Sequence, residues 1–222
     1  MPEGSYTTRS STKKMPATEP PPPPFPIPPP PAGWEQAREV AMVLAEAPTA
    51  SKGHPPDHHH HHLAVAHLSR LVGVELGLSQ EALEVLVLGA LLHDVGKLGV
   101  PEALLLRSGP LTRHEREVIE LHPVVGARII EPVWCLRGVA PVVRHHHERY
   151  DGGGYPDGLR AQEIPLLARI VAAADAYDAM VGRRVYRSGS RPPTEAVGEL
   201  VSRAGSQFDA RVVAALGRVA VR

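Results

Sequence analysis

Residues 142–158 restrict the fold of this chain more than any other stretch, because a histidine cluster is followed at once by a glycine-rich loop. Three imidazoles occupy positions 145–147, and four glycines, one proline and Tyr155 lie between positions 152 and 158. Imidazole nitrogens bind metal ions, whereas glycine lets the backbone approach a ligand closely and proline stiffens a loop. We therefore expect a helix over residues 136–150 that carries ligands and ends against a rigid loop.

A second polar cluster lies upstream, where His93 and Asp94 end an apolar run at residues 85–92. Burying an unpaired carboxylate costs free energy, and binding a metal ion would offset that cost. If the helix continues through Lys97, this lysine lies on the same face as the His-Asp pair. We expect two metal ligands here and an ammonium group that can contact phosphate.

Taken together, the ordered motifs resemble those of the HD-GYP domain, the metal-dependent phosphodiesterase branch of the HD superfamily. The resemblance covers residues 61–216 and implies an HD-type helical bundle. An all-α fold is also expected because no segment alternates apolar and polar residues with the period of a strand. The motifs are His93-Asp94 with Lys97, His122-Pro123, His146-His147-Glu148, the loop Asp151-Gly152-x-Gly154-Tyr155-Pro156-x-Gly158, and Asp175 with Asp178.

The resemblance implies an enzyme that hydrolyses cyclic di-GMP, a bacterial second messenger, to pGpG or further to GMP. Two divalent ions would share a hydroxide that attacks the phosphodiester in line, with Asp94 bridging the ions and Lys97 meeting the charge on the phosphoryl oxygens. Imidazoles and carboxylates without thiolates suit iron, manganese or zinc, and we favour iron or manganese. The implied ligands are His61, His93, Asp94, His122, His146, His147 and Asp175.

The first of these ligands has alternatives. In the family pattern a helix ends where residues 76–79 lie in this chain, and counting back from there places the family's first metal-binding histidine on His61. His54 and His62 are the other candidates in this histidine-rich stretch. Some relatives bind a third ion through a glutamate one helical turn before the first histidine. Because this chain has the shorter Asp57 at that position, a third ion is not expected.

Other residues near the motifs have open roles. Arg184 and Arg187 are candidates for a second phosphate or a guanine face, and Tyr155 either stacks on a base or only shapes the loop. Three successive helical residues cannot all reach one pair of ions, so His145 is expected to lie behind the ligands or in solvent. Glu148 either orients a ligand or is solvated.

Residues 1–33 are rich in proline and are predicted to form a disordered, extended arm before an HD-GYP domain at residues 34–222. Within the domain, Ser79 and Asp209 are predicted helix caps, and residues 112–115 a capping box. The predicted helices span residues 34–47, 63–76, 80–97, 113–121, 124–130, 136–150, 164–181, 194–204 and 210–219.

The amino-acid composition predicts the kind of core and limits the kinds of partner that the chain can have. The 43% hydrophobic residues include only 4% aromatic ones, so the core is predicted to be aliphatic. Balanced charge, with 24 basic and 24 acidic side chains, gives no indication of a nucleic acid polymer. A single cysteine, Cys135, and the absence of a long apolar segment favour a cytoplasmic protein without a membrane span.

A cyclic dinucleotide is the expected substrate, and a diguanylate cyclase (GGDEF) protein is a candidate partner. Two alternatives to the enzyme stay open. One is a degenerate domain that binds cyclic di-GMP or the cyclase without hydrolysis. The other is an HD phosphohydrolase acting on another cyclic dinucleotide.

Overall fold

The computed structural model describes residues 34–46, 57–107, 109–182 and 191–221, and it contains helices but no strand within these ranges. The predicted all-α fold is therefore confirmed. The proline-rich arm, His54, Arg184 and Arg187 lie outside the described residues. The elements are α1 (Trp34–Glu46), α2 (Asp57–Glu75), α3 (Gln80–Leu92), η2 (Val95–Gly99), α4 (Glu102–Leu105), α5 (Arg113–Ile119), α6 (His122–Ile130), η3 (Trp134–Val139), α7 (Ala140–His145), η4 (Ala161–Glu163), α8 (Leu166–Val181), α9 (Pro193–Ser202) and α10 (Ala210–Ala220).

The three predicted helix starts with side-chain caps are confirmed. Ser79 accepts a hydrogen bond from the backbone N–H of Ala82, and Asp209 accepts one from that of Arg211. Thr112 and Glu115 form the reciprocal capping box. These caps satisfy backbone donors that have no partner inside the helix, which is why short polar residues at these positions could be recognised.

Two predicted helix boundaries near the ligands are wrong. Helix α2 begins at Asp57 rather than at residue 63, so the histidine run is helical. Helix α3 ends at Leu92, and Lys97 lies in the separate 3-10 turn η2. The chain turns there because Gly96 packs directly on α6, where an added Cβ would stand 1.9 Å from the carbonyl oxygen of His122.

The predicted helix at residues 136–150 is also divided, into η3 and the short helix α7. Pro141 lies in the first turn of α7, where a missing N–H costs nothing, but it cannot continue a preceding helix. Helix α7 ends at His145, so the histidine cluster lies at a helix end rather than inside a helix.

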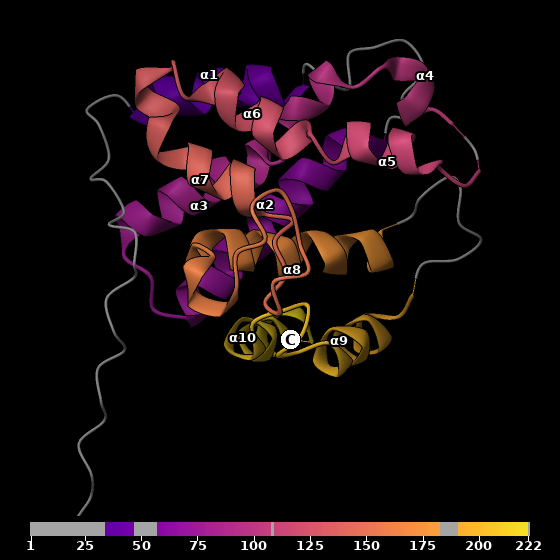
Figure 1. Cartoon of the computed structure of the whole chain (residues 1–222). Coiled ribbons are helices and arrows are strands. Elements are labelled where there is room, and N and C mark those ends of the chain that lie inside the picture. The colour runs from indigo at the N-terminus through magenta and orange to yellow at the C-terminus, as the bar shows by residue number, and fades with distance from the viewer. Residues whose placement is uncertain (1–33, 47–56, 108, 183–190, 222) are drawn as a thin grey trace, which may run out of the picture.

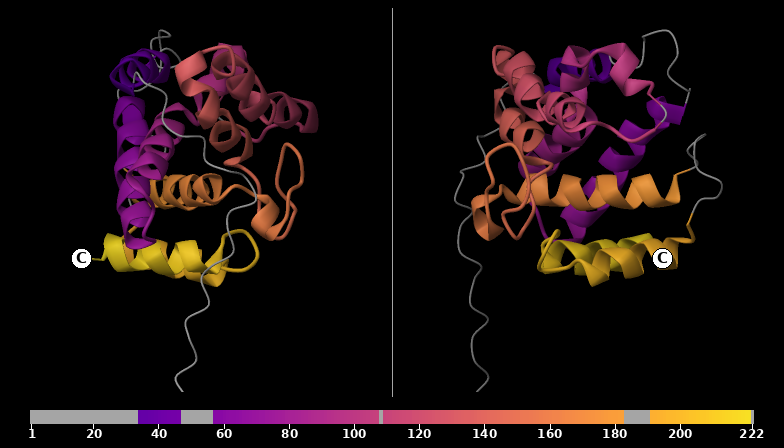
Figure 2. Two further views of the ribbon diagram at one scale, coloured as in Figure 1. Left: turned by 90° about the vertical axis from the view of Figure 1, so that its left-hand side faces the viewer. Right: turned by 45° about the vertical axis from the view of Figure 1, so that its right-hand side comes forward.

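The helices pack around an aliphatic core, as predicted. Helix α2 contacts α3, α8 and α10, whereas α6 contacts η2 and α7. Figure 1 shows α9 and α10 as a layer beneath α8, with α1 and α6 on the opposite side, and Figure 2 shows the same layers from two further directions. The largest fully buried apolar side chains are Leu86, Leu88, Leu92, Ile130, Leu136, Ile164, Ile170, Leu200 and Leu216.

None of the described helices combines the length and the apolar character that a membrane crossing requires. The long connection between α7 and α8 projects beside the bundle (Figure 2). It is tied to the turn between α9 and α10, because the N–H groups of Tyr150 and Asp151 donate to the carbonyls of Gln207 and Ser206.

Candidate metal centre

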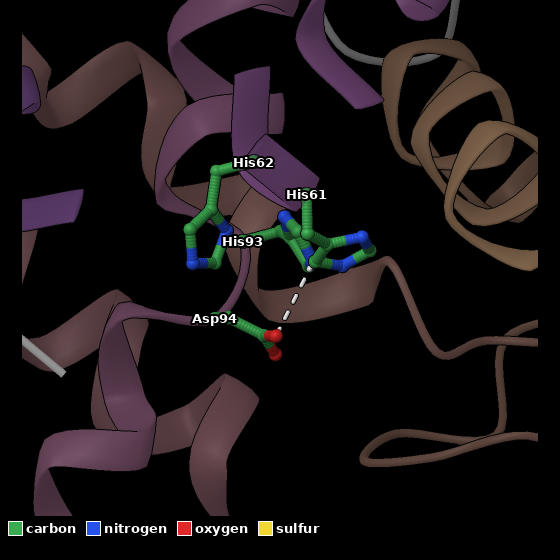
Figure 3. Close-up of side chains that lie close together, drawn as sticks. All are labelled: His61, His62, His93 and Asp94. Atoms are coloured by element: carbon green, nitrogen blue, oxygen red, sulfur yellow. Dashed lines mark ion pairs between the residues drawn. The ribbon is translucent and has the colours of Figure 1, made fainter. Parts of the chain in front are cut away.

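The centre of the bundle holds two groups of side chains whose ligand atoms lie within 4.8 Å of one another. The first group comes from α2 and the end of α3, and Figure 3 shows its four side chains converging. The second group comes from α6, the end of α7 and the residue that both groups share, Asp94. The first group consists of His61, His62, His93 and Asp94, and the second of Asp94, His122, His146 and His147.

Three of these imidazoles are oriented by the backbone. His93 donates from Nδ1 to the carbonyl of Ala90 at 2.7 Å. His122 and His146 do the same to the carbonyls three residues earlier, at 2.8 and 2.7 Å. Each of these histidines stands at a helix boundary, where such carbonyls accept bonds readily. Because Nδ1 carries the proton in each ring, Nε2 presents a lone pair to the centre.

The lone pairs in the second group face each other. Nε2 of His122 lies 3.3 Å from Nε2 of His146 and 3.4 Å from Oδ1 of Asp94. Burial lowers the pKa of both imidazoles, and that of His146 falls well below its usual value, so the rings are neutral. Neutral nitrogens and a carboxylate oxygen at this spacing repel unless a cation lies between them. Two nitrogens that both bind the same ion, each at about 2 Å, would lie about this far from each other.

The donor set therefore fits a divalent metal ion. His93 Nε2 is fully buried, lies 3.5 Å from Oδ2 of Asp94 and has no hydrogen-bond partner among the described residues. Burial lowers the pKa of His147 to about 4, so this ring is neutral as well. Burial alone would raise the pKa of the Asp94 carboxyl group, but the charge of Lys97 holds it well below its usual range. Neutral imidazoles and an ionised carboxylate are the forms that bind metal.

His61 is oriented by side chains instead. Its Nδ1 lies 2.6 Å from Oδ2 of Asp178, and its Nε2 lies 3.2 Å from Oδ1 of Asp175. Both aspartates lie on α8, one helical turn apart. Burial opposes the charged form of His61, but the hydrogen bonds to Asp175 and Asp178 outweigh burial and raise its pKa to about 9.

The sequence-predicted ligands are thus brought together. Six of the seven lie in the two groups, and the seventh, Asp175, contacts His61 from outside them. Of the alternatives for the first ligand, His61 and His62 both reach the first group, and His54 lies outside the described residues. Asp178 was part of the motif set, but its contact with His61 could not be foreseen because the two residues are distant in sequence and meet only in the folded chain.

Lys97 lies at the centre as predicted, although by a different local structure. Its Nζ donates to Oδ2 of Asp94 at 2.6 Å, and its side chain keeps 32% of its surface exposed. The 3-10 turn η2 brings it there, rather than the continued helix that the spacing had indicated. A cation beside Asp94 that is still partly open to solvent can also meet an incoming anion.

The glycine-rich loop packs directly against the histidine cluster. An added Cβ at Gly154 would stand 2.3 Å from the backbone nitrogen of Arg149 and 2.6 Å from the carbonyl oxygen of His147. Only glycine permits this approach, which brings the Tyr155 ring to a centroid distance of 4.9 Å from the His147 ring. Desolvation raises the pKa of the Tyr155 hydroxyl, so this group stays protonated near neutral pH.

Neighbouring side chains hold the loop in place. Glu148 is buried, and its Oε1 accepts from the backbone N–H of Asp157 at 2.7 Å. It therefore neither orients an imidazole nor lies in solvent, the two roles considered from sequence. Arg144 forms a two-pronged pair with the Asp157 carboxylate, at 2.8 and 2.7 Å. His145 lies 3.0 Å from the same carboxylate and outside both groups, as expected from its helical position.

A model of the HD domain family matches residues 38–212, so the chain belongs to the HD domain family. The cyclic di-GMP phosphodiesterase response regulator RpfG of Xanthomonas campestris is 40% identical over 156 residues, which are 69% of this chain and 41% of that protein. The 3'3'-cGAMP-specific phosphodiesterase 1 of Vibrio cholerae is 35% identical over 155 residues, 70% of this chain and 35% of that protein.

A solved structure shares the fold. The HDG"Y"P protein Bd1817 from Bdellovibrio bacteriovorus superposes with a TM-score of 0.63 at 23% identity, over 85% of this chain and 64% of that chain. The resemblance to HD-GYP domains is thereby confirmed. The chain spans about two fifths or less of the length of the curated relatives described above.

Proposed function

We propose that this chain is a metal-dependent phosphodiesterase that hydrolyses cyclic di-GMP to pGpG. The observation that carries the proposal is the pair of neutral imidazole nitrogens of His122 and His146, which face each other at 3.3 Å beside the Asp94 carboxylate. That arrangement is suited to a cation. The relative from Xanthomonas, which is named a cyclic di-GMP phosphodiesterase, supports the choice of substrate.

The residues would divide between two ions, for which iron or manganese is the proposed identity because the donors are nitrogen and oxygen. The first ion would be held by His61, His93, Asp94 and Asp175, and the second by Asp94, His122, His146 and His147. Ions held there would activate a water molecule and offset the charge of the phosphodiester. Asp94 would contribute to both, since it alone belongs to both groups.

Lys97 and Tyr155 would act on the substrate itself. The ammonium of Lys97, partly exposed beside Asp94, would contact a phosphoryl oxygen whose charge increases during cleavage. The Tyr155 ring, held against His147, offers an aromatic face at the edge of the centre on which a guanine base could stack. Arg184 and Arg187 stay proposed contacts of a second phosphate.

The test is metal content and hydrolysis measured on one sample of full-length, untagged protein purified without oxygen. Two ions per chain together with appearance of pGpG support the proposal. The variant His93→Ala should lose both metal and activity, whereas the matched variant His114→Ala should keep both, because the His114 side chain is 87% exposed and belongs to neither group. Hydrolysis by metal-free protein would contradict the proposal.

A second substrate is favoured by the relative from Vibrio cholerae, which is named a 3'3'-cGAMP-specific phosphodiesterase. Cyclic di-GMP and 3'3'-cGAMP should therefore be compared in one assay by their kcat/KM values. A higher value for the mixed dinucleotide would reassign the substrate and keep the phosphodiesterase.

The same measurements test the non-catalytic alternative. Substoichiometric metal with no product from either dinucleotide, after reconstitution, would favour a binding module. In that case the loop around Tyr155 would be tested for binding to a diguanylate cyclase (GGDEF) partner. A cytoplasmic location is part of the proposal, because this is where the nucleotide precursors of such a substrate are made.

A further inference from the structure

We propose that His62 is an additional metal ligand, acting together with His61 rather than in its place. The set of ligands implied by the HD-GYP motifs contains one histidine from α2, whereas this chain has two adjacent ones that both reach the first group. The inference rests on the proposed metal centre. It adds a donor that would make the first group as rich in imidazole as the second.

The orientation of His62 differs from that of the backbone-oriented ligands. In His93, His122 and His146, Nδ1 is bonded to a carbonyl and only Nε2 is free. The His62 side chain is buried, with 7% of its surface exposed, and its Nδ1 is a buried nitrogen without a hydrogen-bond partner among the described residues. Leaving such an atom unpaired destabilises the folded protein, and a bond to a cation removes that cost.

The position of the ring fits a role beside His93. The His62 ring centroid lies 5.3 Å from that of His93 and 5.4 Å from that of His61. Its ligand atom lies within 4.8 Å of those of His61, His93 and Asp94. Figure 3 shows the His62 ring above the Asp94 side chain, and its centroid is about equally far from those of His93 and His61.

Two adjacent residues on a helix point roughly 100° apart, so both can serve one ion only if they approach it from different sides. The contacts of His61 satisfy this condition. Its two nitrogens face Asp175 and Asp178, which draws the ring toward α8. Within the described part of the chain no carboxylate is paired with His62, and its ring lies against that of His93 at the end of α3. The pair would therefore enclose one ion from two directions.

The consequence is a centre whose two groups hold equal numbers of imidazoles. His61, His62 and His93 share one group with Asp94, and His122, His146 and His147 share the other. Imidazole donors favour iron and zinc, whereas carboxylate and water ligands favour manganese and magnesium. His62 would thus bias the first ion toward iron or zinc over manganese.

The experiment compares wild-type protein with His62→Leu and His62→Gln, using His67→Ala as the matched control. His67 is an exposed histidine on the same helix and belongs to neither group. Full-length, metal-free protein is dialysed against limiting Fe²⁺, Zn²⁺ or Mn²⁺, and bound metal is measured by elemental analysis. Co²⁺-loaded samples are compared by visible absorption, which reports on the ligands of the ion.

If His62 is a ligand, both variants lose affinity for one of two ions by about tenfold or more, with a larger loss for Fe²⁺ and Zn²⁺ than for Mn²⁺. The Co²⁺ spectrum changes in both variants and not in His67→Ala. Unchanged stoichiometry, affinity and spectrum in either folded variant would overturn the proposal, because a merely packed side chain has no effect on them.

Circular dichroism and thermal melting of the metal-free proteins identify any variant that fails to fold. Two different replacements are used so that the test still stands if one of them does not fold. Failure of the wild-type protein to bind metal would instead contradict the proposed function, and this inference would be overturned with it. Two bound ions in the wild type and in both His62 variants, with unchanged affinity and an unchanged Co²⁺ spectrum, would contradict this inference alone.

Discussion

The two groups that share Asp94 differ in how His61 is held, because His61 contacts carboxylates whereas His93, His122 and His146 contact backbone carbonyls. In the second group, His122 and His146 are oriented by the carbonyls of Ile119 and Val143. In the first group, His61 is oriented by the carboxylate of Asp178 and faces that of Asp175. Both kinds of partner direct the ring and raise its basicity, and a charged carboxylate raises it more than a neutral carbonyl does. Replacing a single side chain can therefore change how His61 is held in the first group. His122 and His146 in the second group are held by backbone carbonyls at helix ends.

The charges of the two groups follow this difference. In the metal-free protein the contacts with Asp175 and Asp178 raise the pKa of His61 to about 9, against its burial. Burial and the neighbouring His122 lower the pKa of His147 to about 4. His61 of the first group thus forms an ion pair with the aspartates of α8 before metal binds, whereas His122, His146 and His147 of the second group are uncharged. Substitutions that separate these two arrangements test the comparison.

Replacing the shared residue should have the largest effect. Asp94→Asn removes the charge that serves both groups, so both ions should be lost. Hydrolysis should then fall by about three orders of magnitude or more, because the ions supply several kcal/mol of transition-state stabilisation and each 1.4 kcal/mol corresponds to about a tenfold change in rate. Elemental analysis and the hydrolysis assay would measure this. Full metal content in this variant would show that neither group depends on Asp94.

Replacing an imidazole in one group should remove one ion. His146→Ala is expected to lose the second ion and keep the first, with hydrolysis reduced at least about a hundredfold because one source of charge stabilisation is missing. His61→Ala should show the reverse pattern. Metal analysis of the two variants side by side tests this, and loss of both ions in each would mean that the groups bind metal only together.

Lys97→Ala should lower turnover without removing metal. A hydrogen bond to a charged group contributes about 1.5–3 kcal/mol, which corresponds to about a 10- to 100-fold reduction in kcat. Steady-state kinetics and metal analysis on the same sample measure the two effects. Arg113→Ala is the control, because the Arg113 side chain is 93% exposed and belongs to neither group. An unchanged kcat in Lys97→Ala would remove this lysine from the proposed role.

Asp178 distinguishes charge from orientation in the first group. Asp178→Ala should weaken binding of the first ion by about 10- to 100-fold and leave the second unchanged. Asp178→Asn retains an oxygen that can accept from His61 Nδ1, so its effect should be smaller. Metal titrations of both variants would measure the difference. Equal losses would show that the carboxylate charge, rather than the direction of the ring, matters.

The smallest effect is expected where the loop is held by exposed charges. The side chains of Arg144 and Asp157 are about one-third exposed, at 34% and 33%, and such pairs contribute about 0–1 kcal/mol. Asp157→Ala should therefore change KM by less than about fivefold and leave metal content unchanged. Gly154→Ala should raise KM far more, because its Cβ would meet the backbone of Arg149 at 2.3 Å. Equal kinetic effects of the two variants would contradict this view of the loop.

Much of the fold could be predicted because it depends on local patterns. The caps at Ser79, Thr112 and Asp209 are short-range hydrogen bonds between residues two or three positions apart, so the sequence alone identifies them. The boundaries at Leu92 and His145 could not be predicted this way. The first depends on packing between distant segments, because Gly96 lies on α6, and the second lies just before residues 147–149, onto which the loop folds back at Gly154.

The sequence by itself determined the residue types of the centre and their order, because ligand chemistry requires imidazoles and carboxylates and the ordered motifs supply them. Only the tertiary structure decided which of them share a neighbour. Asp94 lies between the two groups, and Asp178, 117 positions from His61, directs its ring. It also brought His62 inward beside His61. The physical reason is that ligand sets form between helix ends that meet only when the core packs, which no spacing along one helix encodes.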